Sequence, residues 1–99
     1  MSCGPPAGAV SVAVRSAIEN CEDWYSRCEN FKATESERQE VSPADEVNGI
    51  TERWCIRVEG ASFRSFSSDA GLWKKDLLVV KRNGIWEYEQ HCLMWMISE

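Results

Sequence analysis

Residues 72–86 read LWKKDLLVVKRNGIW, and this stretch decides the fold. It contains Asn83-Gly84, the preferred pair for a two-residue hairpin turn. Residues 72–82 and 85–97 flank the turn and are rich in β-branched and aromatic side chains, which favour strands. The sequence therefore predicts an antiparallel hairpin over residues 72–97.

The turn also predicts which residues face each other. Without a bulge, Val79 faces Tyr88 and Asp76 faces His91. One face of the hairpin collects Trp73, Leu77, Val79, Trp86, Tyr88, Cys92 and Met94, and the other collects Leu72, Leu78, Val80, Ile85, Leu93, Trp95 and Ile97. We expect a helix on the first face. The second face needs a cover from another protomer, an enclosed cavity or a different partner.

The strand pattern extends upstream of the hairpin. Between Ile50 and Val58, apolar and polar residues alternate with the period of a half-buried strand. Residues 60–62 suit a turn, and residues 62–66 form a weaker strand. Together with the hairpin, these segments predict a four-stranded antiparallel meander over about residues 50–98.

One long amphipathic helix is expected before the sheet. Apolar residues recur every three or four positions, at Val10, Val14, Ala17, Cys21, Trp24, Cys28 and Phe31. This spacing predicts a helix over about residues 10–33, packed through that stripe on the first face of the hairpin. Residues 1–9, rich in Gly, Pro and Ala, are expected to be disordered or frayed, and residues 34–49 to form a polar connection.

The length of 99 residues suits a single domain. Hydrophobic residues make up 43% and charged residues 27% of the chain, as in ordinary globular proteins. The longest uncharged apolar run, residues 92–97, is too short for a membrane span, and residues 1–14 do not resemble an export signal. The sequence thus predicts one soluble α+β domain over residues 10–99, a long N-terminal helix packed on a four-stranded antiparallel meander sheet.

The net charge of −5 resides in the N-terminal half of the chain. Residues 1–49 carry four basic and nine acidic side chains, whereas residues 50–99 carry seven of each. An acidic chain repels phosphate groups, which argues against direct binding of nucleic acid. The charge favours instead a cationic ligand or a basic protein partner, although a solvated helix face also explains it.

The cysteines predict a reduced protein without a metal. There are five cysteines, no Cys-x-x-Cys pair and one histidine, so neither a zinc site nor another cofactor is expected. On one helix, Cys21 and Cys28 would lie about 10 Å apart, beyond the reach of a disulfide. An odd cysteine count without an export signal favours five free thiols and a cytoplasmic location.

The hairpin resembles the closing hairpin of the nuclear transport factor-like superfamily, which includes the SnoaL-like polyketide cyclases. The resemblance covers residues 72–99 and rests on Trp73 and Asp76 in one strand and on Gly84-Ile85-Trp86 at the next. It implies a curved sheet wrapped on helices around a pocket, often in a dimer, that catalyses a reaction or binds a ligand. The family usually has several helices where this sequence predicts one, and a cystatin-like helix on a sheet fits the same pattern.

One predicted pair of side chains is suited to acid-base chemistry. A carboxylate at Asp76 opposite His91 would fix the tautomer of the imidazole and raise its basicity. Cross-strand pairs of this kind are more often structural. A small enzyme that uses His91 and Asp76 is therefore the third of three interpretations, and no catalytic residue is assigned.

The second hairpin face is the predicted functional surface. The residues assigned to ligand binding or an interface are Leu78, Val80, Glu87, Glu89, Leu93 and Trp95. An aromatic ring beside carboxylates suits organic cations. The first interpretation is a non-catalytic binding module for a small cationic or apolar ligand in a concavity lined by Trp and carboxylates. The second is an acidic protein interaction module or inhibitor of a larger partner. A homodimer through this face is also expected, because one helix shields only one face.

Overall fold

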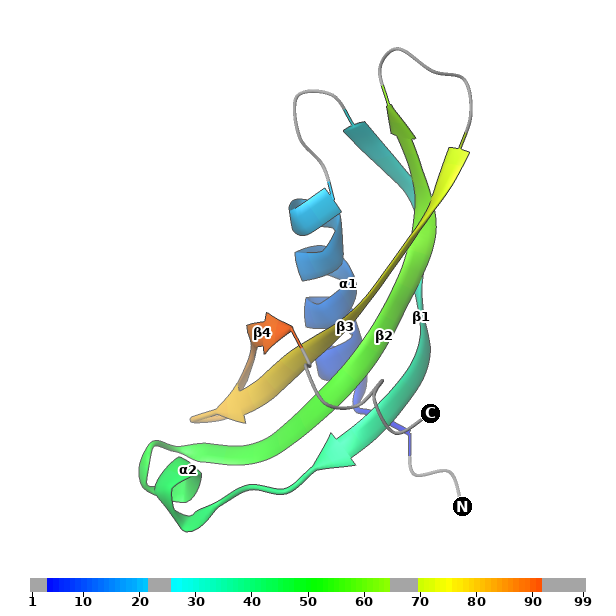
Figure 1. Cartoon of the computed structure of the whole chain (residues 1–99). Helices are drawn as coiled ribbons and strands as arrows, with labels where there is room; N and C mark the ends of the chain where they lie inside the picture. Colours follow the sequence, from blue (N-terminus) through cyan, green and yellow to red (C-terminus); the bar gives the residue numbers. More distant parts are fainter. Residues whose placement is uncertain (1–3, 22–25, 65–69, 92–99) are drawn as a thin grey trace.

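The computed structural model describes residues 4–21, 26–64 and 70–91 of the chain. The elements follow in the order helix α1 (Ala7–Cys21), strand β1 (Ser26–Gln39), helix α2 (Pro43–Val47) and strands β2 (Ile50–Arg64), β3 (Ala70–Arg82) and β4 (Ile85–His91). The strands pair antiparallel in the order β1-β2-β3-β4, which is a meander. Figure 1 shows the long, twisted strands in front of α1.

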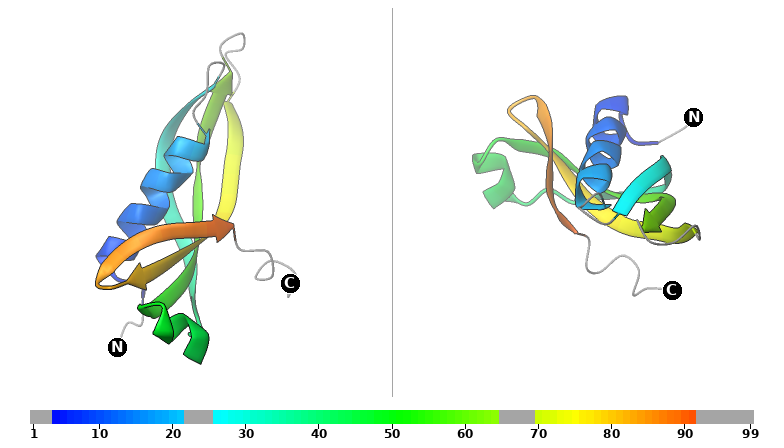
Figure 2. Two further views of the ribbon diagram at one scale, coloured as in Figure 1. Left: turned by 90° about the vertical axis from the view of Figure 1, so that its left-hand side faces the viewer. Right: turned by 90° about the horizontal axis from the view of Figure 1, so that it is seen from above.

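Helix α1 packs against one face of the sheet (Figure 2). We name this the inner face, and the opposite one the outer face. The predicted α+β arrangement of one helix on a four-stranded antiparallel sheet is confirmed. The helix has 15 residues, and within the described part of the chain no helix has the length and apolar character needed to cross a membrane.

The predicted helix over residues 10–33 is correct only in its first half. Helix α1 begins at Ala7, inside the segment that was expected to be disordered or frayed, and ends at Cys21. The carbonyl of Pro6, just before the helix, accepts a hydrogen bond from the N–H of Ala9 at 3.0 Å. Proline suits this place because it has no N–H to donate and its φ is already close to the helical value.

Strand β1 lies where the sequence predicts the end of the helix and the polar connection. Its 14 residues are mostly polar, and its apolar positions are Cys28, Phe31 and Ala33. Cys28 and Phe31 continue the three- and four-residue spacing of α1, so the periodicity predicted too long a helix. Pairing with β2 along the length of β1 overrides the local preference.

The sheet also begins differently from the predicted one. The turn predicted at residues 60–62 is wrong, because Gly60 lies inside the single 15-residue strand β2. The first of the two predicted strands and residues 62–64 of the second therefore belong to one strand, and β1 supplies the remaining strand of the four. Residues 65 and 66 lie outside the described part of the chain. A glycine weakens a strand, but pairing with strands on both sides keeps β2 extended through Gly60.

The closing hairpin is confirmed near its turn. Asn83 and Gly84 have φ angles of 53° and 85°, which a type I′ turn requires at both central positions. Val79 faces Tyr88, as predicted.

A bulge in β4 changes the register farther from the turn. The pairing shifts by one residue between Val79 and Leu78, so that Leu77 faces His91. The predicted pairing of Asp76 with His91 is therefore wrong. A turn sequence fixes the register only up to the first bulge.

The core lies between α1 and the inner face. Ala9, Ala13 and Ala17 recur every four residues along α1 and have no exposed surface. Their short side chains allow the helix to approach the sheet closely. The core consists of Ala9, Val12, Ala13, Ala17, Trp54, Ile56, Val58, Leu77 and Val79, with Trp73, Trp86 and Tyr88 among the residues packed against it. The inner face is thus the predicted first face of the hairpin.

The buried side of α1 is rotated relative to the predicted stripe. Ala17 and Cys21 are buried as predicted. Val10 and Val14 are only partly buried and lie at the border of the core. Trp24 lies outside the described residues.

A disulfide joins Cys21 and Cys28, so the prediction of free thiols is wrong for this pair. The prediction placed both cysteines on one helix, whereas Cys21 is the last residue of α1 and Cys28 belongs to β1. Their Cα atoms are 6.4 Å apart, within the usual range for a disulfide. Cys55 on β2 is also disulfide-bonded. The Cys21–Cys28 bond ties the end of the helix to the first strand.

We expect loss of this bond to destabilise the fold. In the double variant Cys21→Ser and Cys28→Ser, the free energy of unfolding should fall by about 2–3 kcal/mol, because the unfolded chain loses a short covalent loop. Urea denaturation measures the change. Each single variant should lose about as much as the double variant, and an unchanged transition in the double variant would contradict the stabilising role of the bond.

Candidate functional site

A row of three charged side chains crosses the outer face. Glu35 on β1, Arg57 on β2 and Asp76 on β3 are direct cross-strand neighbours. Arg57 Nε donates to Asp76 Oδ1 at 3.0 Å, and Arg57 Nη1 donates to Glu35. The side chains of Arg57 and Asp76 are only 9% and 7% exposed. The centre of this face therefore carries an ion-paired row in which Arg57 and Asp76 are buried, and not the apolar surface predicted from the hairpin alone.

Asp76 is paired with a guanidinium rather than with an imidazole. The register places Leu77 opposite His91, one residue away from the predicted partner. The carboxylate that was expected to orient His91 binds Arg57 instead. The direct cross-strand pairing on which the predicted acid-base arrangement depended is therefore not formed.

A second arginine on the outer face links three elements. Arg53 on β2 donates from Nη1 to Asp45 Oδ2 at 2.6 Å and from Nη2 to Glu89 Oε2 at 3.3 Å. Asp45 lies in α2. The N–H of Ser42, the residue just before this helix, also donates to the Asp45 carboxylate at 3.0 Å. These donors, Arg53 foremost, hold the pKa of Asp45 well below its usual value. The hydrogen bond between Arg53 and Asp45 also raises the pKa of the Arg53 guanidinium.

The four apolar residues predicted for the functional surface do not form an exposed patch in the described part of the chain. Val80 has no exposed surface, and Leu78 is partly buried. Leu93 and Trp95 lie outside the described residues. A partner that approaches the outer face therefore finds no free surface on Val80.

The two predicted carboxylates are engaged with arginines. Glu89 binds Arg53, and Glu87 accepts a hydrogen bond from Arg82 Nε at 2.7 Å. Both carboxylates remain partly exposed. Their charges are balanced locally, which lowers their attraction for a cationic ligand.

A hollow of about 680 Å³ lies beside Glu89. It is lined by Glu37, Arg38, Gln39, Glu40, Arg53, Leu78, Glu89 and Gln90. Two of the predicted site residues, Leu78 and Glu89, thus share one hollow. A neighbouring hollow of about 520 Å³ shares Arg38, Gln39 and Glu40 with it and adds Glu46. Both are predominantly polar surfaces near α2.

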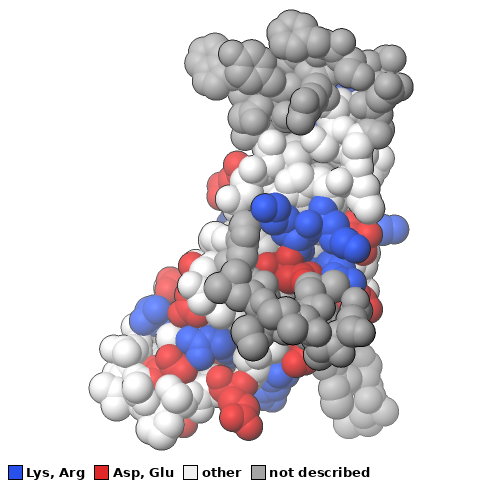
Figure 3. Space-filling model, in the orientation of Figure 1, with Lys and Arg blue, Asp and Glu red and all other residues white. Residues whose placement is uncertain are grey.

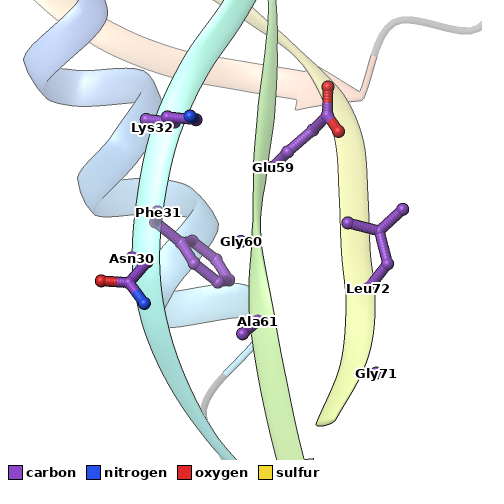
Figure 4. A pocket seen from close by; sticks show the side chains of 8 residues that line it. All are labelled: Asn30, Phe31, Lys32, Glu59, Gly60, Ala61, Gly71 and Leu72. Atoms are coloured by element: carbon purple, nitrogen blue, oxygen red, sulfur yellow. The ribbon is translucent and has the colours of Figure 1, made fainter.

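A larger hollow, of about 800 Å³, lies farther along the same strands. It is lined by Asn30, Phe31, Lys32, Glu59, Gly60, Ala61, Gly71 and Leu72 (Figure 4). We name it the Gly60 hollow. Side chains reach it from three strands, with Lys32 on β1, Glu59 on β2 and Leu72 on β3. Leu72 is 73% exposed.

A bulge in β1 shapes this hollow. Asn30 and Phe31 lie opposite the single residue Gly60, because the pairing shifts between Glu29 and Lys32. Asn30 has a φ of 59°, in the left-handed region that Asn tolerates better than most residues. The bulge and the small side chain of Ala61 leave the outer surface of the sheet open at this point.

Two aromatic rings support the floor of the Gly60 hollow from the inner side. The Phe31 ring lies directly over Gly60, and a Cβ added at Gly60 would overlap it. Phe31 stacks on Trp73 with ring centroids 5.0 Å apart. Trp73 is also the residue that faces Gly60 across the β2–β3 pair. Glycine is required here by close approach rather than by an unusual φ angle.

A second charged row runs along the Gly60 hollow. Lys32 faces Glu59, and Glu59 faces Lys74. Glu59 Oε2 accepts a hydrogen bond from Thr34 Oγ1 at 2.7 Å. Among the residues that the structure describes, neither Lys32 nor Lys74 forms an ion pair. Figure 3 shows Lys and Arg side chains gathered on the outer face next to Asp and Glu side chains.

The Gly60 hollow was missed because its residues come from segments predicted as helix and turn. Asn30 and Phe31 were expected inside the helix, and Gly60 in a turn. The residue that could have indicated the hollow from the sequence is Gly60. An isolated glycine in a strand pattern indicates a bulge or a close approach of another group. Nothing local to the sequence, however, indicates that the bulge lies on residues 30 and 31.

We expect Gly60→Ala to destabilise the protein by about 1–3 kcal/mol, because the new methyl group must displace the Phe31 ring. Gly71→Ala is the matched control. The nearest atom to a Cβ at Gly71 is the carbonyl oxygen of Ser62 at 3.8 Å, so this variant should lose no stability. Thermal denaturation of both variants measures the difference, and equal effects would contradict the close packing at Gly60.

We expect stability to decrease as the pH falls below about 4, the ordinary pKa of an aspartate. The folded state lowers the pKa of Asp45, so the stabilisation is complete above the unfolded-state pKa and is lost as the pH falls through the folded-state pKa. In Asp45→Asn the decrease should be shallower, since an amide oxygen still accepts from Ser42 N–H but cannot titrate. Glu46→Gln, the next residue of α2, is the control. Acid titrations of unfolding that superimpose for wild type and Asp45→Asn would contradict this assignment.

In the described part of the chain, the outer face thus presents two charged rows, the Gly60 hollow and the hollow beside Glu89. Among residues 4–21, 26–64 and 70–91, no group of three or more His, Cys, Asp or Glu side chains is placed to hold a metal ion. The suspected relationship to the nuclear transport factor-like superfamily stays a prediction. Neither a protein-family model, nor a curated protein, nor a solved structure matches the chain.

Proposed function

We propose that this protein is a non-catalytic binding module that takes a small ligand with an apolar body into the Gly60 hollow. The observation that carries the proposal is the hollow itself, an opening of about 800 Å³ whose lining includes Gly60, Ala61 and Gly71. This volume falls within the range of small-molecule sites. The ligand would cover Leu72, an apolar side chain that is otherwise left largely in water.

The construction of the floor supports a binding role. A rigid base reduces the loss of conformational entropy on binding, because few groups must be ordered by the ligand. Phe31 and Trp73 stack behind Gly60, and pairing on both sides holds β2 in place. The catalytic interpretation is weaker, since Asp76 is bound to Arg57 and His91 faces Leu77.

A second candidate function is an acidic surface for a basic protein. Glu37, Glu40 and Glu46 are exposed around the two smaller hollows near α2. A triple Glu→Gln variant at these positions should lose salt-dependent binding of a lysine-rich peptide.

The homodimer remains a further proposal, which sedimentation of the intact chain tests. Val80 belongs to the surface predicted for the dimer contact, and its complete burial argues against that surface.

The disulfides also bear on where the protein works. The cytoplasmic location was predicted from the odd cysteine count and the lack of an export signal. Cys21, Cys28 and Cys55 are disulfide-bonded, and structural disulfides persist mainly in oxidising compartments. We therefore propose an oxidising environment in place of the cytoplasm. Alkylation of the freshly isolated, denatured protein should leave Cys21 and Cys28 unmodified.

The binding proposal is tested by titrating the ¹⁵N-labelled protein with 1-octanol, a neutral molecule with an apolar body. We expect the amide signals of Gly60, Ala61 and Gly71 to shift and saturate, while that of Gly84, in the distant hairpin turn, stays in place. An apolar chain gains about 0.8 kcal/mol for each CH₂ group that it buries. Absence of saturable shifts at these residues up to the solubility of octanol would overturn the proposal.

Two variants separate the Gly60 hollow from other apolar surface. Ala61→Phe places a ring in the hollow and should abolish the octanol shifts without lowering the thermal midpoint. Ile85→Asn removes another exposed apolar side chain, 67% exposed and remote from the hollow, and should leave octanol binding unchanged. Equal loss in both variants would indicate non-specific adsorption.

A further inference from the structure

We infer that the Gly60 hollow selects ligands with an anionic head, such as a carboxylate joined to an alkyl or aryl body. This inference rests on the proposed binding function and adds the charge of the ligand to it. It reverses the sign expected from the sequence, which favoured a cationic ligand because the chain carries a net charge of −5. The charged side chains next to the hollow are net positive, whereas the whole chain is net negative.

The first argument is the presence of two lysines that form no ion pair within the described part of the chain. Lys32 lines the hollow, and Lys74 lies in the same cross-strand row beyond Glu59. Residues directly opposite each other on paired strands project from the same face with Cβ atoms about 5 Å apart. Both ammonium groups therefore belong to the outer face, and neither has an ion-pair partner among the described residues.

The second argument concerns the one carboxylate that lines the hollow. Glu59 lies between Lys32 and Lys74, and its Oε2 accepts a hydrogen bond from Thr34 Oγ1 at 2.7 Å. Two positive charges and one negative charge in this row give a net charge of +1. A cationic head would meet two ammonium groups, whereas an anionic head can bind one lysine without breaking the Thr34–Glu59 hydrogen bond.

The third argument is that four other carboxylates of the outer face are already paired. Glu35 and Asp76 bind Arg57, while Asp45 and Glu89 bind Arg53. In these pairs an arginine balances the negative charge of each carboxylate, so the carboxylates repel an anionic ligand in the Gly60 hollow less. The lysines beside the hollow are consequently the charges most available to a ligand that rests on its floor.

Three probes with the same octyl chain and different heads test the inference: nonanoate, 1-octanol and octyltrimethylammonium. Dissociation constants come from the amide shifts of Gly60 and Gly71 at low ionic strength and neutral pH. We expect nonanoate to bind about two- to fivefold more tightly than octanol, the gain typical of one partly exposed ion pair, and octyltrimethylammonium to bind more weakly than octanol. The double variant Lys32→Gln and Lys74→Gln should bring the three constants together.

Lys81→Gln is the matched control, because Lys81 faces Trp86 near the hairpin turn, far along β3 from the hollow. It should keep the full preference for nonanoate. Saturable binding of all three probes with equal constants would overturn the inference and leave the binding function intact. Tighter binding of octyltrimethylammonium would overturn it in favour of a cationic ligand. Failure of all three probes to bind would remove the proposed function as well.

Discussion

A buried guanidinium constrains the arrangement of the three long strands. Arg57 projects from the middle of β2 onto the outer face with only 9% of its side chain exposed, and a charge buried in this way needs partners on both sides. Glu35 on β1 and Asp76 on β3 supply them, each directly opposite Arg57. A slip of one residue in either pair would move the partner carboxylate to the inner face, among the apolar residues of the core. Strand order, register and the orientation of the Gly60 hollow all depend on this row.

The sequence predicted those parts of the fold that short-range patterns encode. The Asn83-Gly84 turn, the start of the hairpin and the inner face with Trp86 and Tyr88 follow from local rules. Strand β1 does not, because it is mostly polar and acquires its structure by pairing with a strand far along the chain. The Cys21–Cys28 disulfide could not be predicted for the same reason. Once Cys28 was placed on a helix, its distance from Cys21 excluded the bond.

The functional surface was predictable only in part. Alternation in the hairpin identified the outer face. However, Leu78, Val80 and Glu89 were assigned to the functional surface without knowledge of the neighbouring side chains on β2. Arg53 and Arg57, which project from β2, turn much of that face into ion pairs. The Gly60 hollow requires a bulge on one strand, a glycine on the next and Leu72 on a third to meet. Such a coincidence depends on strand pairing and leaves no continuous motif.

The polar composition of β1 has a consequence for the behaviour of the protein at high concentration. This strand forms one edge of the sheet and is 14 residues long, so it would offer a template for another chain to add its own strand and begin aggregation. Glu29, Lys32, Glu35, Glu37 and Arg38 place charges along it, and two irregularities interrupt its pairing pattern. Both features discourage edge-to-edge growth. The sequence that made β1 difficult to recognise as a strand therefore also protects the folded chain from polymerising through it.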